Sequence, residues 1–524
     1  MSAPLVSVSG VRGIVGESFT EDLVRRWARA FARFVIASEA PEPERSSVQG
    51  GAKQSRGKSD EIASSLLAPR NDRKIVVGRD TRPSGAWALD VAARTVAECG
   101  VQPITVGTVP TPTVQLAVTH HRAAGGLIIT ASHNPTEWNG LKFLGPDGVF
   151  LSAGEMESLH RSVFASPASG GAKQSHDDQG VASSPPAPRK DTRVSDGQAI
   201  NRHIANVLGL PLGVEAIRHR KFRVVLDPVN GAGALAVPPL LERLGCQVTV
   251  INGEPDGKFA HPPEPTPANL TELGDRVRAD GADLGIAVDP DADRLVLVSE
   301  EGRVLSEEYT ITLATLAVLS APVVLSGVKN RTHRDPSSTT QDDKQVVAVN
   351  LSTTRMVDDV ARQLDATVIR TPVGERHVVE GMRRHGALIG GEGNGGVIFP
   401  ESHEGRDALV GIALILDLLA KRGESLATVV SALPRYVMVK EKLALSDRNQ
   451  LPKLTEELRK LADSVPGSSI STLDGVRVDT PDGWVHLRLS NTEPMIRLIA
   501  EATDEPAVHR LLGTTRTAVK TTGH

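Results

Sequence analysis

The stretch that decides the fold is Gly126-Leu127-Ile128-Ile129-Thr130-Ala131-Ser132-His133-Asn134-Pro135. Residues 127–129 form a short apolar run with β-branched members, which is typical of a strand buried on both faces. The chain then becomes polar at once, and Pro135 prevents a helix from beginning directly after the strand. Open α/β sheets carry their chemistry at the carboxyl edge of such strands. The pattern therefore places the hydroxyl of Ser132 at a candidate reactive edge, although an ordinary Ser/Asn/Pro turn has the same composition.

The order of elements around this stretch is repeated twice further along the chain. In each copy a strand, a helix and a second strand precede a closing strand that ends in a loop of unusual composition. Strands that alternate with helices predict mostly parallel sheets. The sequence from about residue 434 differs, because its short strands and two helices indicate a smaller α+β domain. The expected fold is therefore three similar mixed α/β domains with mostly parallel sheets, followed by a smaller C-terminal α+β domain, around a central cleft. The expected repeats lie at 74–132, 222–288 and 346–389.

Three segments do not fit the repeat and are expected to be low-complexity inserts. Two of them contain an identical short sequence, since Gly50-Gly51-Ala52-Lys53-Gln54-Ser55 recurs as Gly170-Gly171-Ala172-Lys173-Gln174-Ser175. They are too polar to bury a core, so disorder is expected there. The inserts are placed at about 38–73, at 166–193 and at about 330–344. The domains are then placed at 1–165, 194–300, 301–433 and 434–524.

Composition argues against several classes of partner. The net charge is −4 and the pI is near 6.5, so no basic excess points to nucleic acid or to an anionic membrane surface. No stretch has the roughly 18 uninterrupted apolar residues of a membrane span, and the N-terminus lacks the basic and apolar regions of a signal peptide. We expect a cytoplasmic protein that binds neither nucleic acid nor membrane. The sequence leaves both a monomer and a homodimer open.

The second closing strand ends in three alternating aspartates. Asp289, Asp291 and Asp293 lie at positions i, i+2 and i+4, where their carboxylates can converge on one hard cation. An EF-hand would need glycine where Arg294 stands, and a strand follows directly, so that motif is rejected. We predict a Mg²⁺ site with coordination positions left for a phosphate oxygen or water; the alternative is a solvated acidic turn.

The third closing strand ends in the glycine-rich run 390–396, in which Glu392 and Asn394 are the only side chains able to read a ligand. Carboxylate and amide groups there suit sugar hydroxyls. The run lacks the spacing of a dinucleotide site, and a flexible glycine turn is its alternative. A fourth loop, in the tail, offers donors suited to a phosphate dianion; a capped turn with solvated arginines is the alternative. Its donors are Arg488, Ser490, Asn491, Thr492 and Arg497.

These four loops supply a hydroxyl nucleophile, a divalent-cation loop, a hydroxyl-reading loop and a phosphate clamp. Together they indicate phosphoryl transfer on a phosphorylated polyol. No P-loop lysine motif and no protein-kinase motif set occurs, so ATP is not the evident donor. The phosphate is expected to come from the enzyme itself. A glycine-punctuated segment near the N-terminus adds Arg12, which could meet a phosphate or carboxylate.

The chain resembles the α-D-phosphohexomutase superfamily, and within it the sequence most resembles bacterial phosphoglucosamine mutases. The resemblance rests on Thr130–Pro135, Asp289–Arg294, Gly391–Gly396 and Arg488–Pro494, in the order of the family's motifs. It implies four domains around a cleft and a phosphoserine at Ser132. The four domains, in order, would be a phosphoserine domain (1–165), a metal-binding domain (194–300), a sugar-binding domain (301–433) and a phosphate-binding domain (434–524). It also implies that Ser132 and the three aspartates hold one Mg²⁺ per active site.

The remaining site residues are carried over by resemblance. Arg294 would lie beside the transferring group, and Arg12 and Lys142 near the phosphoserine. Lys142 is a candidate proton shuttle; the alternative is an ordinary exposed surface lysine. His133 would orient the loop. Glu392 and Asn394 would contact sugar hydroxyls. The residues that would hold the phosphate that does not react are Arg488, Ser490, Asn491, Thr492 and Arg497.

The reaction implied by the resemblance moves a phosphate between O6 and O1 of a hexose phosphate. Phospho-Ser132 would give a bound hexose 1,6-bisphosphate, which turns round before a phosphate returns to Ser132. The context favours glucosamine 6-phosphate as substrate. However, Gly391–Gly396 and Ser490–Pro494 both depart from the pattern typical of glucosamine phosphate mutases, so phosphomannomutase and phosphoglucomutase activity are the alternatives. Rivals of other classes are a catalytically inactive sugar-phosphate binding protein and a metal-dependent phosphatase.

Overall fold

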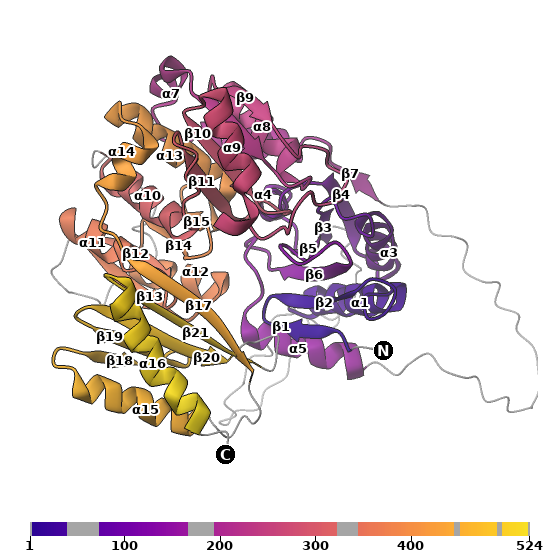
Figure 1. The fold of residues 1–524 in the computed structure, drawn as a ribbon. Coiled ribbons are helices and arrows are strands. Elements are labelled where there is room, and N and C mark those ends of the chain that lie inside the picture. Colours follow the sequence, from indigo (N-terminus) through magenta and orange to yellow (C-terminus); the bar gives the residue numbers. More distant parts are fainter. Residues whose placement is uncertain are drawn as a thin grey trace, which may run out of the picture.

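The computed structural model describes residues 3–38, 73–165, 193–321, 344–444, 451–489 and 495–521. Its elements form four units in chain order, each built on one sheet, which Figure 1 shows from indigo at the right to yellow at the lower left. The three expected inserts lie almost wholly outside the described residues. Across the ranges described, no helix is long and apolar enough to cross a membrane.

The first unit is a seven-stranded sheet with the reactive stretch near its middle. Strands β5, β3 and β4 pair in parallel, and β6, β2 and β1 extend the sheet antiparallel from β5. In order, the strands are β1 (Leu5–Ser7), β2 (Gly10–Ile14), β6 (Trp138–Leu144), β5 (Gly125–Ile129), β3 (Lys74–Arg79), β4 (Gln102–Thr108) and β7 (Val194–Ser195). The helices are α1 (Glu21–Ser38), α3 (Gly85–Glu98), α4 (Thr111–His120) and α5 (Ala153–Ala165). Because β7 pairs with β4, the first sheet includes residues 194 and 195, where the second domain was expected to begin.

The second and third units repeat the parallel arrangement. In the second, the sheet runs β11 (Leu295–Ser299), β10 (Leu284–Val288), β8 (Arg223–Asp227) and β9 (Gln247–Val250). In the third it runs β13 (Ala366–Thr371), β12 (Gln345–Asn350), β14 (Ile389–Glu392), β15 (Gly396–Phe399) and β16 (His403–Arg406). The helices of the second unit are α6 (Ala199–Leu208), α7 (Val214–Arg220), α8 (Gly233–Arg243) and α9 (Thr271–Asp280), with a 3₁₀ turn at Pro267–Asn269. Those of the third are α10 (Glu308–Leu319), α11 (Met356–Gln363), α12 (Glu375–His385), α13 (Ala408–Arg422) and α14 (Leu426–Ser431).

Each of the three sheets contains the predicted parallel trio, so the repeat is confirmed. The sheets are mixed, because antiparallel strands extend every trio beyond its closing strand. The third closing strand also runs further than expected, through Glu392, into the segment predicted as loop. Glycine is required there because a Cβ on Gly391 would lie 2.3 Å from the Gly396 carbonyl oxygen.

The fourth unit is an antiparallel sheet covered by two helices, as predicted for the tail. Its strands, in spatial order, are β17 (Val437–Ala444), β21 (Met495–Ala502), β20 (Gly483–Leu489), β19 (Val476–Thr480) and β18 (Ser469–Ser471). The helices are α15 (Leu451–Ser464) and α16 (Glu505–Thr521). The sheet and helices enclose a hydrophobic cluster of their own.

The second and third units, in contrast, share one core. A single cluster of buried side chains runs from Ile204 to Leu433. Helix α13 lies at its centre and contacts α10, α7 and α6. Asp407 caps this helix by accepting hydrogen bonds from the amides of Leu409 and Val410, and Gly423 ends it with a φ of 68°. The shared core holds these two units together, whereas the fourth unit has a separate core and therefore fewer constraints on its position.

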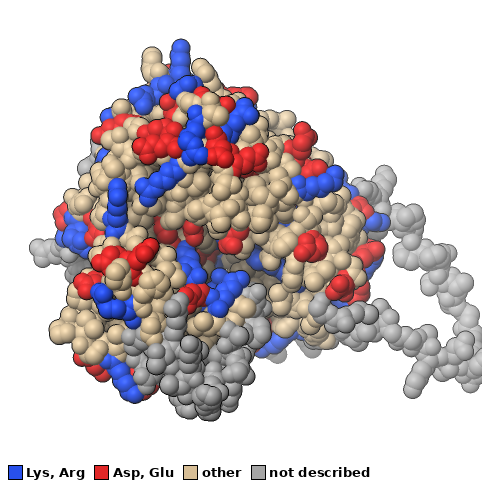
Figure 2. Space-filling model, in the orientation of Figure 1, with Lys and Arg blue, Asp and Glu red and all other residues tan. Residues whose placement is uncertain are grey.

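The four units surround a common hollow. In the space-filling view, the middle of the visible face is hollowed, and Lys and Arg side chains gather along its lower side (Figure 2). The closing strands β5, β10 and β14 are the third strands of equivalent parallel trios, so their carboxyl ends present equivalent loops.

Candidate active site

The loop after β5 holds Ser132 in an unusual backbone conformation. Ser132 has a φ of 50°, in the left-handed region that few side chains other than glycine adopt without cost. Its amide donates to Thr130 Oγ1 at 2.8 Å, and Thr130 Oγ1 donates to Asp80 Oδ2 at 2.7 Å. Side chains from two strand ends thus fix the turn, and the strained residue is the one predicted to be reactive.

A buried arginine, missed by sequence reasoning, organises this loop. Arg82 has no exposed side-chain surface. Its two terminal nitrogens donate to four backbone carbonyls of the loop at 2.6–2.8 Å, and Nε donates to Asp80 Oδ2 at 3.1 Å. The four carbonyls belong to Ser132, Asn134, Pro135 and Trp138. The polar Asp-Thr-Arg run directly after β3 is the signal that could have identified it, because β3 is the parallel neighbour of β5.

The aspartate loop after β10 lies directly against Ser132. Ser132 Oγ donates to Asp289 Oδ2 at 2.9 Å. Thr111, at the start of α4, donates through Oγ1 to Asp291 Oδ2 at 2.8 Å, and its amide donates to the Asp291 carbonyl at 2.9 Å. These bonds join the first unit to the second at the predicted metal loop.

The three aspartates have the properties of a cation site. One carboxylate oxygen from each of Asp289, Asp291 and Asp293 lies within 4.8 Å of the others, and all three residues are buried. Among the described residues, Asp291 Oδ1 and Asp293 Oδ1 have no hydrogen-bond partner, although buried polar atoms are normally paired. Burial raises the pKa of Asp289 well above its ordinary value, and the charges of Asp291 and Asp293 raise it further. A hard divalent cation would satisfy the orphaned oxygens and offset this repulsion, so the residues fit such an ion.

Lys142 and Arg12 also reach this region. The Lys142 side chain is 4% exposed; its Nζ donates to Asp291 Oδ2 at 2.8 Å and lies 3.7 Å from Asp293 Oδ2. Although burial by itself would raise the pKa of Asp291, the Lys142 ammonium and its hydrogen bond hold that pKa well below its usual range. Arg12 Nη1 donates to Asn134 Oδ1 at 2.9 Å, within the reactive loop. Neither side chain is a solvated surface group.

His133 and Arg294 lie at the rim of the same cluster. His133 Nδ1 is 3.3 Å from Ser132 Oγ. Burial, followed by the positive charges of Arg294 and Arg12, lowers the pKa of His133 well below its ordinary value, so the imidazole is neutral near pH 7. Arg294 lies 3.8 Å from both Asp293 Oδ1 and Glu264 Oε1, and within the described chain its Nε has no hydrogen-bond partner. Its guanidinium therefore retains capacity for an anion.

The glycine-rich loop 390–396, which is predicted to read sugar hydroxyls and is called the sugar loop below, is held rigidly at the end of β14. Glu392 is buried; its Oε1 accepts from Asn350 Nδ2 at 2.8 Å and from the Gly374 amide at 2.9 Å. Arg406 Nη1 donates to Glu392 Oε2 at 2.6 Å, and Asn394 Nδ2 lies 3.4 Å from the same oxygen. Glu392 and Asn394 therefore lie side by side, within a network that joins them to the cation loop through Arg406.

Two of the predicted phosphate-binding residues lie within the described chain. Arg488 on β20 and Arg497 on β21 are directly opposite in register, and Lys442 on β17 is opposite Arg497. Like charges placed opposite each other repel, and a bound anion would relieve that repulsion. Asp474 Oδ2 accepts from Arg488 Nε at 3.1 Å and from the Val373 amide of the third unit at 3.0 Å. Ser490, Asn491 and Thr492 lie outside the described residues.

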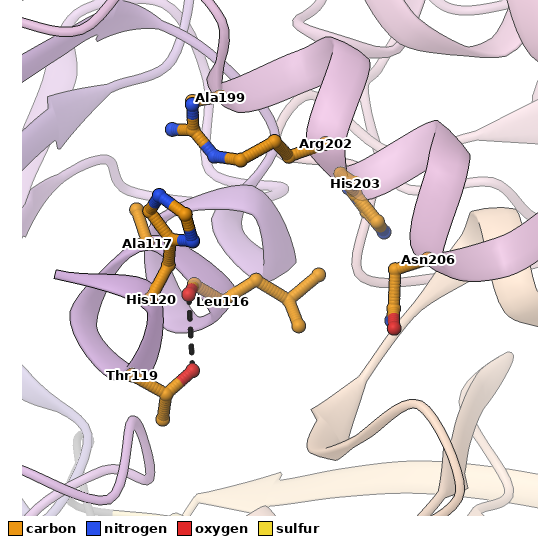
Figure 3. A pocket seen from close by; sticks show the side chains of 8 residues that line it. All are labelled: Leu116, Ala117, Thr119, His120, Ala199, Arg202, His203 and Asn206. Carbon is orange, nitrogen blue, oxygen red and sulfur yellow. Dashed lines mark hydrogen bonds between the residues drawn. The ribbon is translucent and has the colours of Figure 1, made fainter. Parts of the chain in front are cut away.

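A cavity of about 300 Å³ lies elsewhere, between α4 and α6 (Figure 3). Its lining includes His203, whose ring bonds to Thr113 Oγ1 at 2.8 Å and to Asp407 Oδ2 at 2.7 Å. None of its lining residues belongs to the four loops. The cavity lies where α4 and α6 meet and contains none of the predicted site residues. The candidate active site is therefore defined by the four loops and not by this cavity.

Comparisons with known proteins agree with this geometry. Four matches follow one another along the chain, all described as phosphoglucomutase/phosphomannomutase: α/β/α domain I over residues 57–168, domain II over 201–302, domain III over 332–436 and the C-terminal domain over 438–517. The chain belongs to the phosphoglucomutase/phosphomannomutase family. It is therefore an α-D-phosphohexomutase, an isomerase, as the sequence motifs indicated.

Individual members of this family differ in name. A phosphoglucomutase/phosphomannomutase of Thermococcus kodakarensis is 36% identical over 86% of this chain and 91% of its own length. A probable phosphoglucosamine mutase of Methanopyrus kandleri is 32% identical over 96% of this chain and 95% of its own. The crystal structure of a phosphoglucomutase/phosphomannomutase family protein from Burkholderia thailandensis has a TM-score of 0.75 at 24% identity, covering 99% of this chain and 97% of its own, which supports the fold.

Proposed function

We propose that this phosphohexomutase works through phosphorylated Ser132 and interconverts glucosamine 6-phosphate and glucosamine 1-phosphate. The observation that supports the proposal most strongly is the hydrogen bond from Ser132 Oγ to Asp289 in a turn fixed by Arg82. This bond joins the hydroxyl of the strained residue to one of the three carboxylates that fit a cation. No other nucleophile is needed for the transfer.

In the proposed reaction, a hydroxyl of the hexose phosphate attacks the phosphorus carried by Ser132. The new O–P bond forms as the bond to Ser132 Oγ breaks, and one proton passes from the sugar hydroxyl to Oγ. Lys142 is the proposed relay for that proton, because its ammonium is buried within the cluster. A Mg²⁺ held by Asp289, Asp291, Asp293 and the phosphoserine would neutralise charge on the transferring group.

The other loops determine orientation. Glu392 and Asn394 hold sugar hydroxyls, and Arg488 and Arg497, with the neighbouring loop, hold the phosphate that does not react. The bisphosphate formed in the first transfer turns round and returns its other phosphate to Ser132. The fourth unit has its own core, so it can adjust its position to let the bisphosphate turn while water is excluded. Hexose 1,6-bisphosphate is the intermediate of the proposed reaction, and we expect it to act as an activator as well.

A preference for mannose or glucose phosphates is the second candidate. It is favoured by the departures at Gly391–Gly396 and Ser490–Pro494 and by the name of the Thermococcus relative. Both candidates use the same chemistry, and the sugars differ only at C2, which carries an amino group in glucosamine, a hydroxyl in glucose and a hydroxyl of the opposite configuration in mannose. The protein acts on a small molecule, in the cytoplasm, as a monomer or homodimer under this proposal.

The test is a Mg²⁺-dependent isomerisation assay on glucosamine, mannose and glucose 6-phosphates, compared by kcat/KM. We expect glucosamine 6-phosphate to give the highest value; a clear preference for mannose 6-phosphate would overturn the substrate assignment. Intact-mass measurement should find one phosphate on the wild-type chain and none on Ser132→Ala. If Ser132→Ala isomerises at the wild-type rate, the phosphoserine pathway is refuted. Release of inorganic phosphate without isomerisation would indicate a phosphatase instead.

A further inference from the structure

Arg406 joins the cation loop to the sugar loop. It is the last residue of β16, and its side chain is 11% exposed. Nη2 donates to Asp293 Oδ2 at 2.7 Å, Nη1 donates to Glu392 Oε2 at 2.6 Å, and Nε lies 3.1 Å from Glu375 Oε2. One guanidinium thus contacts carboxylates from three separate elements, two of which belong to predicted ligand-binding loops.

The neighbouring strand leaves room for this side chain. A Cβ on Gly396 of β15 would lie 2.2 Å from Arg406 Cδ, so glycine is required beside the arginine stem. The same glycine donates its amide to Asn394 Oδ1 at 3.2 Å. Close packing therefore fixes the arginine and the sugar loop together, and the guanidinium has little freedom to leave its three partners.

Arg406 also determines which Asp293 oxygen remains available. Oδ2 accepts from Arg406, whereas Oδ1 is buried and, among the described residues, has no hydrogen-bond partner. A partner that fixes one oxygen of a carboxylate orients the other toward a cation. At its other end, Arg406 opposes the effect of burial, which alone would raise the pKa of Glu392, so that this carboxylate stays ionised.

We propose that Arg406 is a positioning residue that couples cation binding to sugar recognition, by fixing Asp293 and Glu392 to one rigid group. The part of this inference that concerns the sugar rests on the proposed function, whereas the part that concerns cation binding does not. It predicts that loss of Arg406 weakens the binding of a divalent cation and of the hexose phosphate together. A residue that acted only on fold stability would alter neither affinity in the folded protein.

The experiment uses Mn²⁺ as the probe and compares Arg406→Lys and Arg406→Met with the full-length wild type. Free Mn²⁺ is counted by electron paramagnetic resonance, with and without glucosamine 6-phosphate. Because a lysine ammonium cannot contact three carboxylates as a guanidinium does, both variants should bind Mn²⁺ roughly 10–100-fold more weakly. KM should rise in both. The sugar phosphate should tighten Mn²⁺ binding in the wild type and should fail to do so in either variant.

Arg383→Met is the matched control. Arg383, on α12 of the same unit, pairs with Glu404 and Asp147 away from the four loops. The Arg383→Met variant should bind Mn²⁺ with the affinity of the wild type. If Arg406→Met fails to fold, Arg406→Lys decides, since it retains the charge. Wild-type Mn²⁺ affinity within about twofold in Arg406→Lys would overturn the proposal, because loss of such a partner costs at least about tenfold. If the Mn²⁺ effects appear but the protein isomerises no hexose phosphate, the proposed function fails and the coupling of Arg406 to the cation stands.

Discussion

Replacing Arg82 should loosen the reactive loop more than any other single change outside the four motifs. The guanidinium makes five side-chain hydrogen bonds, four to loop carbonyls and one to Asp80. A lysine ammonium has three donors, so Arg82→Lys removes at least two of these five hydrogen bonds. At about 1.5–3 kcal/mol for each hydrogen bond to a charged group, we expect a loss of about 3–6 kcal/mol in the free energy of unfolding.

Urea denaturation followed by tryptophan fluorescence measures this loss, because Trp27, Trp87 and Trp138 all lie in the first unit. With a urea slope of about 1–3 kcal/mol/M, the midpoint should fall by about 1 M or more. Hydrogen exchange should accelerate in the peptide that covers residues 130–138, before global unfolding. Arg82→Met should be more severe, because it leaves the buried Asp80 carboxylate without its cation, a change that costs about 3–5 kcal/mol by itself.

Arg79→Lys is the control for that measurement. Arg79 lies at the end of β3, is half-buried, and donates one hydrogen bond, to the Asp80 carbonyl. It should leave both the midpoint and the exchange of the loop nearly unchanged. If Arg82→Lys exchanges no faster than the wild type over 130–138 and keeps its urea midpoint, the loop is not held by the arginine, and the reasoning is refuted.

Three further changes test other parts of the site. Lys142→Met should lower kcat by about 10²–10⁴-fold, the range for loss of a proton-transfer group; an unchanged kcat would exclude the relay. Gly393→Ala would place a Cβ 2.1 Å from Glu308 Oε2 and should lower kcat/KM by roughly 100-fold through displacement of the sugar loop, whereas Gly154→Ala, in open space, should be neutral. Burial lowers the pKa of His486 from 6.5 to about 4; because the folded pKa is depressed, stability is complete above pH 6.5 and falls by about 3 kcal/mol as the pH drops to 4. The urea midpoint should therefore fall less between pH 7.5 and pH 5 in His486→Gln than in the wild type. An equal fall in the two proteins would show that His486 is not the cause.

The sequence predicted well those features that neighbouring residues encode. The alternation of strand and helix, the closing strands and the three equivalent loops all follow from local patterning. Ser132 and the three aspartates could be identified because a buried strand immediately precedes each group. The extension of β14 through Glu392 was missed, because a glycine run predicts a loop unless the close approach of β15 is known.

What the sequence alone determined is therefore the order of the elements and the chemistry offered at each strand end. Only the tertiary structure decided how those groups are supported. Arg82 lies 50 residues from the Ser132 carbonyl that it binds, and Arg406 lies 113 residues from Asp293. Lys142, which sequence reasoning weighed against a surface position, is buried because the aspartate loop of the next unit folds over it. Contacts at such separations leave no period or spacing in the chain; they exist because packed sheets bring distant strand ends to one hollow.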